Sequence, residues 1–319
     1  MRIESLDRGH LAVARELLGR SCAFDRADDV ADEKLFGAGP SSTARAIGAF
    51  DGNDLIGLAA TAGRHLRVLA VAPEARDHGV GTALLRDCET TVLAAEPRIR
   101  ALDQPGNYLA PGIDERNIDT IAWLERRGWI RETEPRLNVL IAVRDNPRVT
   151  RERTDELAHK CRANGYEIRR AHPDEAELLA AVAKEFGGAW PFELARALGH
   201  TFDLAPAEET TRLTNAPESI TSTNDALGSG VHVALKDGVY CAFAAHDGNN
   251  RGLGWFGPTG TWPDHRGNRL GEALLLACLV DVADFHDHCE VAWIGPRPFY
   301  EKVASIAMDR RFVAMKRER

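Results

Sequence analysis

The chain has 319 residues, of which 44% are hydrophobic and 28% charged, and its net charge is −8. This predicts a globular protein of two domains, and the acidic balance argues against a nucleic-acid-binding surface. The start, MRIESLDRGHL, lacks the apolar core of a signal peptide, and the longest uncharged apolar run, 273–280, is too short to cross a bilayer. We therefore expect a cytoplasmic protein without a membrane segment. The six cysteines show no C-x-x-C spacing and are expected to be reduced.

The first half predicts a mixture of strands and helices. Short apolar runs bounded by Gly, Asp and Asn indicate strands, and longer periodic runs indicate helices. The expected strands are Arg2–Glu4, Ala46–Phe50, Leu55–Thr61, Leu66–Val71, Ile99–Leu102 and Leu137–Val143. The expected helices are Leu11–Leu18, the apolar run after Gly81, and Thr120–Arg127.

The second half repeats this order. Its expected strands are Glu167–Arg169, Val231–Leu235, Tyr240–Ala245, Trp255–Thr261, Glu290–Ile294 and Arg311–Met315. Its expected helices are Asp174–Phe186, the run after Gly271, and Pro298–Val303. A charged stretch, Arg151–Arg162, lies between the halves and predicts a linker helix. We therefore predict a domain at 1–145, a linker at 146–165 and a second domain at 166–319. Each domain is expected to be α+β, with a mixed, mostly antiparallel twisted sheet flanked by helices.

A ten-residue phrase occurs once in each half. It reads RDHGVGTALL from Arg76 and RGNRLGEALL from Arg266, which is 190 positions later. A gapless alignment of Val71–Val92 with Thr261–Val282 contains eight identities in 22 positions. In both halves the phrase follows an expected strand and enters an expected helix, so the two halves are predicted to share one fold.

The phrase has the properties of a phosphate-binding loop. The first amides of a helix have no partner within the helix, and the helix start carries partial positive charge. Gly79 and Gly81 let the backbone approach an anion, and Arg76 adds charge. The alternative is an ordinary glycine-containing turn between strand and helix. Neither a G-x-x-x-x-G-K-[ST] loop nor a G-x-G-x-x-G loop after a first strand is present in the sequence.

The pattern V-x-P-x-x-R-x-x-G-x-G-x-x-L-L, from Val71 to Leu85, resembles the acyl-CoA signature of the GNAT acetyltransferase superfamily. The resemblance implies acetyl-CoA as cosubstrate, with its pyrophosphate on the loop amides and its pantetheine beside the preceding strand. The second copy departs from the pattern, because Arg269 stands where the first glycine is usual. The implied cofactor-binding residues are Leu69, Val71, Arg76, His78, Gly79, Val80, Gly81 and Thr82 in the first half, and Thr259, Thr261, Arg266, Gly267, Asn268, Arg269, Leu270, Gly271 and Glu272 in the second.

Among tandem GNAT chains, this sequence is most similar to glucosamine and glucosaminide N-acetyltransferases. The segments that carry the similarity are PGNYLAPGID (105–114), GYEIRRA (165–171), AWPFELARAL (189–198), WFGPTGTWPDHRG (255–267) and AWIGPRPFYEKV (292–303). The similarity implies a small-molecule amine acceptor, with an amino sugar as the expected substrate. Mycothiol synthases share the tandem arrangement and are the competing family.

The two halves differ where the chemistry of acetyl transfer is expected. Acetyl transfer to an amine needs an acid for the leaving thiolate and a base for the attacking amine. The resemblance implies that Tyr300 is the acid, whereas Leu124 stands at the matching place in the first half. We therefore expect catalysis in the second half, although core packing of Tyr300 is the alternative. His246 and Glu193 are the candidate bases, each with the alternative of a solvated surface residue, and a water chain could replace both.

Three further expectations concern ligands and partners. His286 and His288 lie two residues apart, but no cluster of further ligands accompanies them, so no metal site is expected. The chain is expected to be a monomer or homodimer. An acyl-CoA-binding regulatory or scaffold protein without turnover is the alternative function. The sequence does not identify the acceptor, whose pocket would be shaped by loops such as Thr201–Ser229.

Overall fold

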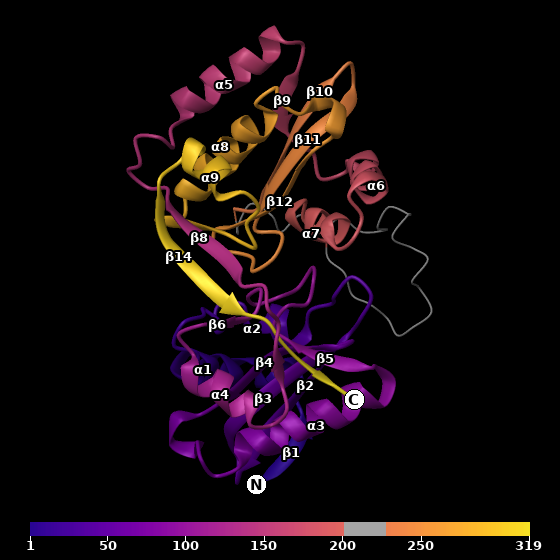
Figure 1. Cartoon of the computed structure of the whole chain (residues 1–319), viewed down its shortest axis with the longest axis vertical. Coiled ribbons are helices and arrows are strands. Elements are labelled where there is room, and N and C mark those ends of the chain that lie inside the picture. The colour runs from indigo at the N-terminus through magenta and orange to yellow at the C-terminus, as the bar shows by residue number, and fades with distance from the viewer. Residues whose placement is uncertain (201–227) are drawn as a thin grey trace. The chain divides into compact units, whose positions relative to one another are not determined.

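The computed structural model describes residues 1–200 and 228–319, which form two compact units (Figure 1). Unit 1 contains residues 1–136 and 311–319, and unit 2 contains the described residues of 137–310. Most of the loop Thr201–Ser229, expected to shape an acceptor pocket, lies outside the described residues. Within the described residues, no helix is long and apolar enough to cross a membrane.

Unit 1 is built on a seven-stranded sheet with the order β1-β2-β3-β4-β5-β15-β7. Its neighbours pair antiparallel except for β4 and β5, which pair in parallel. The bounds are β1 Arg2–Ser5, β2 Ala44–Asp51, β3 Asp54–Ala62, β4 His65–Val71, β5 Arg98–Ala101, β7 Ile130–Arg131 and β15 Met315–Glu318. A two-residue strand, β6 (Ile113–Asp114), pairs with the end of β14 at Phe312 and Val313.

One long helix, α3 (Val80–Ala95), carries most of the helical contribution to the core of unit 1. It buries Val80, Leu84, Leu85, Cys88 and Val92, which recur every three or four residues and so share one face of the helix. These side chains join apolar residues of the sheet in one cluster. The other helices of this unit are α1 Leu11–Ser21, α2 Ala31–Phe36 and α4 Ile118–Glu125.

Unit 2 is built on a sheet with the order β14-β8-β13-β12-β11-β10-β9. Here β12 and β13 are the parallel pair, and β8–β13, β12–β11, β11–β10 and β10–β9 are antiparallel. The bounds are β8 Arg136–Ala142, β9 Glu167–Arg170, β10 Gly230–Lys236, β11 Val239–His246, β12 Trp255–Thr261, β13 His288–Val291 and β14 Ile306–Val313.

The helices of unit 2 cover both faces of its sheet. In Figure 1, α8 (Leu270–Ala283) lies on one side of β10 to β12, and α6 (Ala176–Glu185) and α7 (Trp190–Ala197) lie on the other. Eleven of the 14 residues of α8 are buried, since α5 (Arg151–Ala163) covers its outer side. The remaining helix, α9 (Arg297–Val303), follows β13 and also contacts α8. The apolar clusters on the two faces keep the sheet of unit 2 out of water.

The predicted α+β class is confirmed, because each unit is a mixed sheet flanked by helices. The strand expected at 137–143 forms as β8, which pairs with β13 of unit 2. The strand expected at 311–315 is divided between the end of β14 and the first residue of β15, and β15 pairs with β5 and β7 of unit 1. Strand periodicity reports which face is buried and carries no information on the partner strand. The domain ranges 1–145, 146–165 and 166–319 stay a prediction.

Candidate functional site

The two copies of the repeated phrase adopt the same backbone path. After β4 and β12, a single 3₁₀ turn (Pro73–Ala75 and Pro263–His265) leads to an arginine. Arg76 Nε donates to the carbonyl of Val71, and Arg266 Nε donates to that of Thr261, each at 3.3 Å. The structure therefore brings the predicted loop residues of each copy together at the start of a long helix.

The residue before each helix is left-handed in both copies. Gly79 has φ 83° and Arg269 has φ 62°, and they are the N-caps of α3 and α8. An L-residue with a side chain costs about 1–2 kcal/mol in this region, so the glycine is the natural residue and Arg269 is a tolerated exception. The first helical hydrogen bonds are made by Ala83 to Gly79 and by Ala273 to Arg269, both at 3.0 Å. The amides of the three residues that precede Ala83, and of the three that precede Ala273, have no carbonyl partner within the helix. They point out of the helix start, where they can hold an anion.

A gap opens beside the strand that precedes each loop. β4 pairs with β5 only at His65–Arg100 and Leu66–Ala101, and β12 pairs with β13 only at Trp255–Glu290 and Phe256–Val291. The later residues of β4 and β12 have no such partner in the parallel strand. The predicted residues Leu69, Val71, Thr259 and Thr261 lie on these splayed segments and are all half-buried. An extended ligand could therefore pair with either segment and reach the anion-binding loop.

Tyr300 lies on α9 beside the loop of unit 2. The ring of its neighbour Phe299 is 3.4 Å from the position that a Cβ on Gly271 would take. In unit 1 the ring of Trp123 on α4 lies 3.5 Å from the equivalent position on Gly81. Tyr300 and Leu124 therefore occupy matching places, one residue after each aromatic side chain.

The hydroxyl of Tyr300 is kept in its neutral form. The side chain is 6% exposed, and its burial raises the pKa above the usual value for tyrosine, although a backbone hydrogen bond with Gly295 acts in the opposite direction. A buried neutral phenol retains a proton that it can donate. The ring also packs edge-on against Phe299, with ring centres 5.0 Å apart, so Tyr300 contributes to the core as well.

The splayed strands differ in one side chain near the point where the parallel pairing ends. The offset of 190 that aligns the loops also pairs Arg67 of β4 with Gly257 of β12. Arg67 is fully buried and donates through Nε to Gln104 Oε1 and through an Nη to the carbonyl of Gly37. Among the residues that the structure describes, none but its chain neighbours has a heavy atom within 4 Å of the place that a Cβ on Gly257 would take. The same strand position thus carries a buried guanidinium side chain in one unit and no side chain in the other.

Arg67 has a measurable structural role. An Arg67→Met variant keeps a long side chain but leaves the buried oxygens of Gln104 and Gly37 without its donors, and each such loss costs about 1–3 kcal/mol. We expect unit 1 to lose about 2 kcal/mol or more in free energy of unfolding, measured by urea denaturation. Arg64→Met, at an exposed turn residue three positions earlier, is the control and should be neutral. Equal midpoints for both variants would contradict the role given to Arg67.

The candidate bases are both buried, which corrects the alternative that they are solvated surface residues. His246 is fully buried, with Nδ1 3.2 Å from Asp247 and Nε2 3.5 Å from Asp281 on α8. Burial opposes its charged form, but the hydrogen bonds with the two aspartates keep its pKa above the usual value. Glu193 is 6% exposed in the first turn of α7, which packs so closely on Gly248 that a Cβ there would clash with the Glu193 carbonyl. The two candidates therefore lie near the same end of β11.

The first helical turn carries a different charge in each unit. In unit 2, Glu272 is 5% exposed and accepts two bonds of 2.8 Å from Arg269, and Lys302 lies 3.4 Å away. The bonds from Arg269 hold the pKa of Glu272 below its usual value. Thr82 occupies this position in unit 1, where its hydroxyl accepts from Arg127 at 2.9 Å. The first turn of α3 therefore has a neutral hydroxyl where the first turn of α8 has a carboxylate paired with Arg269.

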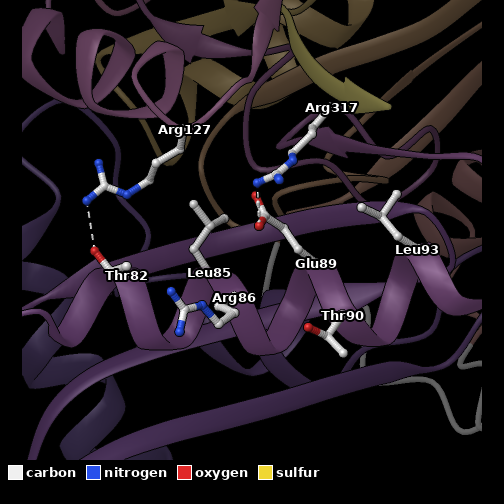
Figure 2. Close-up of a pocket in the computed structure, with 8 residues that line it drawn as sticks. All are labelled: Thr82, Leu85, Arg86, Glu89, Thr90, Leu93, Arg127 and Arg317. Carbon is white, nitrogen blue, oxygen red and sulfur yellow. Dashed lines mark hydrogen bonds and ion pairs between the residues drawn. The ribbon is translucent and has the colours of Figure 1, made fainter. Parts of the chain in front are cut away.

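A pocket of about 380 Å³ runs along α3 from this threonine (Figure 2). Figure 2 shows Arg127 bonded to Thr82 at one end and Arg317 bonded to Glu89 further along the helix. The lining residues are Thr82, Leu85, Arg86, Glu89, Thr90, Leu93, Arg127 and Arg317. Three arginines and one glutamate leave the pocket positive, so it continues the anion-binding character of the loop.

Arg67, Arg127 and Glu272 show what sequence reasoning missed or left unexplained. Arg67 was detectable as the one charged residue in the otherwise apolar run LRVLAV, although the sequence does not reveal its partners. Arg127 bonds to Thr82, which lies 45 positions earlier in the chain, and no local sequence pattern predicts such a contact.

Within the described residues, no group of three or more His, Cys, Asp or Glu side chains is placed to hold a metal ion.

No protein-family model and no curated protein sequence matches this chain. Its fold is shared with several solved structures. A GCN5-related glucosamine N-acetyltransferase region of a fungal multi-domain GH3 β-N-acetylglucosaminidase has a TM-score of 0.70 and 15% identity over 99% of this chain. This chain spans only 38% of that protein.

Two further solved structures match nearly end to end. A tandem GNAT protein from the clavulanic acid biosynthesis pathway has a TM-score of 0.66 and 16% identity, covering 99% of this chain and 98% of its own. A GCN5-related N-acetyltransferase from Sphaerobacter thermophilus has a TM-score of 0.59 and 16% identity, covering 99% and 95%. Similarity at such low identity demonstrates a common fold, and the prediction of two tandem GNAT-like units is thereby confirmed.

Proposed function

We propose that this chain is an N-acetyltransferase that moves the acetyl group of acetyl-CoA directly to a primary amine, with unit 2 as the catalytic unit. The observation that carries this proposal is the position of Gly257 on the splayed part of β12, where no side chain stands and where unit 1 has the buried Arg67. An amino sugar is the proposed acceptor. It is supported by the sequence resemblance and by the printed description of the first solved structure as a glucosamine N-acetyltransferase region.

In the proposed reaction the residues of unit 2 hold and orient acetyl-CoA and protonate the leaving thiolate. The amides at the start of α8, with Arg266, would hold the pyrophosphate, and the backbone of β12 beyond Phe256 would pair with the pantetheine. The amine nitrogen forms a bond to the acetyl carbon, and the bond from that carbon to sulfur breaks. Tyr300 donates its hydroxyl proton to the leaving thiolate. His246, Glu193 or a water chain accepts the proton of the amine, and the hydrogen bonds with the two aspartates, which raise the pKa of His246, favour its proton-bearing form.

Unit 1 is proposed to bind acetyl-CoA without turning it over. Its loop has the left-handed glycine, a threonine in the first helical turn and the positive pocket along α3. It lacks a tyrosine at the place of Leu124, and it has the buried Arg67 at the strand position where unit 2 has Gly257. These features favour binding and disfavour chemistry.

The test of the proposed function is release of the CoA thiol in the presence of a panel of amines, with glucosamine first. We expect release that depends on both the amine and the protein, and formation of the N-acetylated amine detected by mass spectrometry. Acetyl-CoA binding is measured in parallel by calorimetry. Binding without release for any amine would overturn the proposal.

That outcome would favour the second candidate, an acyl-CoA-binding protein without turnover. Glu272 is the observation in its favour, because a carboxylate in the first turn of α8 opposes an incoming pyrophosphate and occupies Arg269. Release restricted to an amine of a cysteine-bearing disaccharide would instead favour a mycothiol-synthase-like acetyltransferase.

A substitution at the loop tests where turnover takes place. Gly271→Asp places a carboxylate at the second position of α8, where it suits the helix dipole but repels pyrophosphate. The Cβ itself meets only ordinary contacts of 3.4 Å and longer, so the variant should fold. We expect kcat/KM for acetyl-CoA to fall at least about 10-fold, since a loss of about 1.4 kcal/mol of binding already has that effect. The matched variant Gly81→Asp in unit 1 should leave this kcat/KM unchanged, and the opposite pattern would move catalysis to unit 1.

A further inference from the structure

Trp293 has an unusual backbone at the end of the parallel strand of unit 2. It follows β13 by two residues and has φ 48°, in the left-handed region. Its N–H donates to Asn138 Oδ1 at 2.8 Å. Asn138 is a fully buried residue of β8, and its Nδ2 donates in turn to Glu290 Oε1 at 2.7 Å. A polar network therefore holds this tryptophan in a conformation that residues with side chains seldom adopt.

The side chain of Trp293 is 43% exposed. The other tryptophans of unit 2 are less exposed. Trp255 is 3% exposed, and Trp190 and Trp262 pack on the ring of Phe186 with ring centres 5.3 and 5.0 Å apart. Strained residues that the core does not require are concentrated at functional sites. Trp293 is thus the tryptophan of this unit whose position points to a ligand.

The place of Trp293 in the sheet identifies the site. The amide of Ala292 meets the carbonyl of Phe256 at 3.5 Å, and this is the last contact between the two parallel strands. The next residues on each side are Trp293 and Gly257, which lies on β12. Trp293 is therefore the first residue of its strand past the pairing with β12, opposite the segment beside which the proposed function has the amine meet the thioester.

We propose that the indole of Trp293 forms the wall of the acceptor site and recognises the C–H face of a pyranose ring. This inference rests on the proposed function and names the acceptor class of the same site. A flat apolar ring, 43% exposed and next along the chain from the last hydrogen bond between the parallel strands, fits an acceptor with one apolar face and a polar edge. Glu290, bonded by Arg310 at 2.9 and 3.0 Å, anchors the network below and so preserves the orientation of the indole.

The test compares two amines with Trp293 variants. Trp293→Ala is expected to raise the KM for glucosamine about 10-fold, to leave the KM for acetyl-CoA unchanged, and to leave the KM for an acyclic amino alcohol such as serinol unchanged. Trp293→Phe keeps an aromatic face and should retain most of the affinity for glucosamine. Phe285→Ala removes another exposed aromatic residue of unit 2, 56% exposed, and is the control that should change nothing.

A second measurement separates this inference from the proposed function. Saturation-transfer NMR detects contact of the glucosamine ring hydrogens with the protein and needs no turnover. If the signal is present with the wild type and lost with Trp293→Ala, the inference stands even where no acetyl transfer occurs. Equal KM changes for glucosamine and serinol, or an unchanged NMR signal in Trp293→Ala, would overturn it.

Discussion

A Tyr300→Phe variant is expected to lose about 100-fold or more in kcat while binding acetyl-CoA as tightly as the wild type. The substitution removes a single oxygen from a side chain that is 6% exposed, so the packing of the ring against Phe299 is preserved. The thiolate of CoA would then leave without a proton donor. Burial keeps the pKa of Tyr300 above its usual value, so the hydroxyl carries its proton throughout the neutral range.

Thiol release at saturating amine gives kcat, and calorimetry gives the affinity for acetyl-CoA. Tyr240→Phe is the matched control. Tyr240 lies on β11, and its hydroxyl donates to Glu175 at 2.7 Å, outside the proposed reaction. That variant should keep kcat within a few-fold of the wild type. An unchanged kcat for Tyr300→Phe would remove the tyrosine from the mechanism and leave it with its role in the core.

The second large effect is expected at Asp281, the centre of a buried polar cluster in unit 2. Its Oδ2 accepts from His232 Nε2 at 2.8 Å and from Arg170, and lies 3.5 Å from His246 Nε2. Burial alone would raise the pKa of Asp281, but the two histidines outweigh it and hold the pKa well below its usual value. Asp281→Asn would leave the fully buried His246 with one carboxylate partner instead of two.

We expect Asp281→Asn to lower the free energy of unfolding by about 3 kcal/mol, the low end for removing one partner of a buried charge pair. The half-exposed Arg170 contributes little to this loss, because water screens it. Urea denaturation followed by tryptophan fluorescence measures the effect. Asp284→Asn is the control, since Asp284 pairs with Arg151 at the surface, and it should be neutral within about 0.5 kcal/mol. Equal losses for both variants would show that the cluster is not stabilising.

The same cluster predicts a pH dependence with a definite sign. The raised pKa of His246 contributes stability that is full below the unfolded value of 6.5 and is lost as pH rises through the folded value. The lowered pKa of Asp281 contributes stability that is present above 3.8 and is lost as the pH falls toward the folded value. The free energy of unfolding of unit 2 should therefore be highest in the mildly acidic range. Its decrease above pH 6.5 should be smaller in Asp281→Asn than in the wild type.

The loops illustrate how far local sequence information reaches. Proline, arginine and glycine at fixed spacing between a strand and a helix predict a backbone path by themselves, because the steric and hydrogen-bonding requirements of the turn are local. Both copies follow that path, including the one in which Arg269 takes the place of glycine. The candidate bases show the limit of such reasoning. His246 and Glu193 read as surface residues at a strand end and a helix start, and the packing of α7 and α8 buries them.

The amino-acid sequence by itself determined the α+β class, the internal repeat, the backbone path of the two turns and the contrast between Tyr300 and Leu124. Each of these depends on patterns within short segments of the chain. Only the tertiary structure decided that β8 pairs with β13 and β15 with β5. It also decided that Arg67 is buried where the other unit has Gly257, and that the side chain of Trp293 is 43% exposed. These features depend on which distant segments meet, since a side chain fills or lines a gap only when another part of the chain forms its opposite wall.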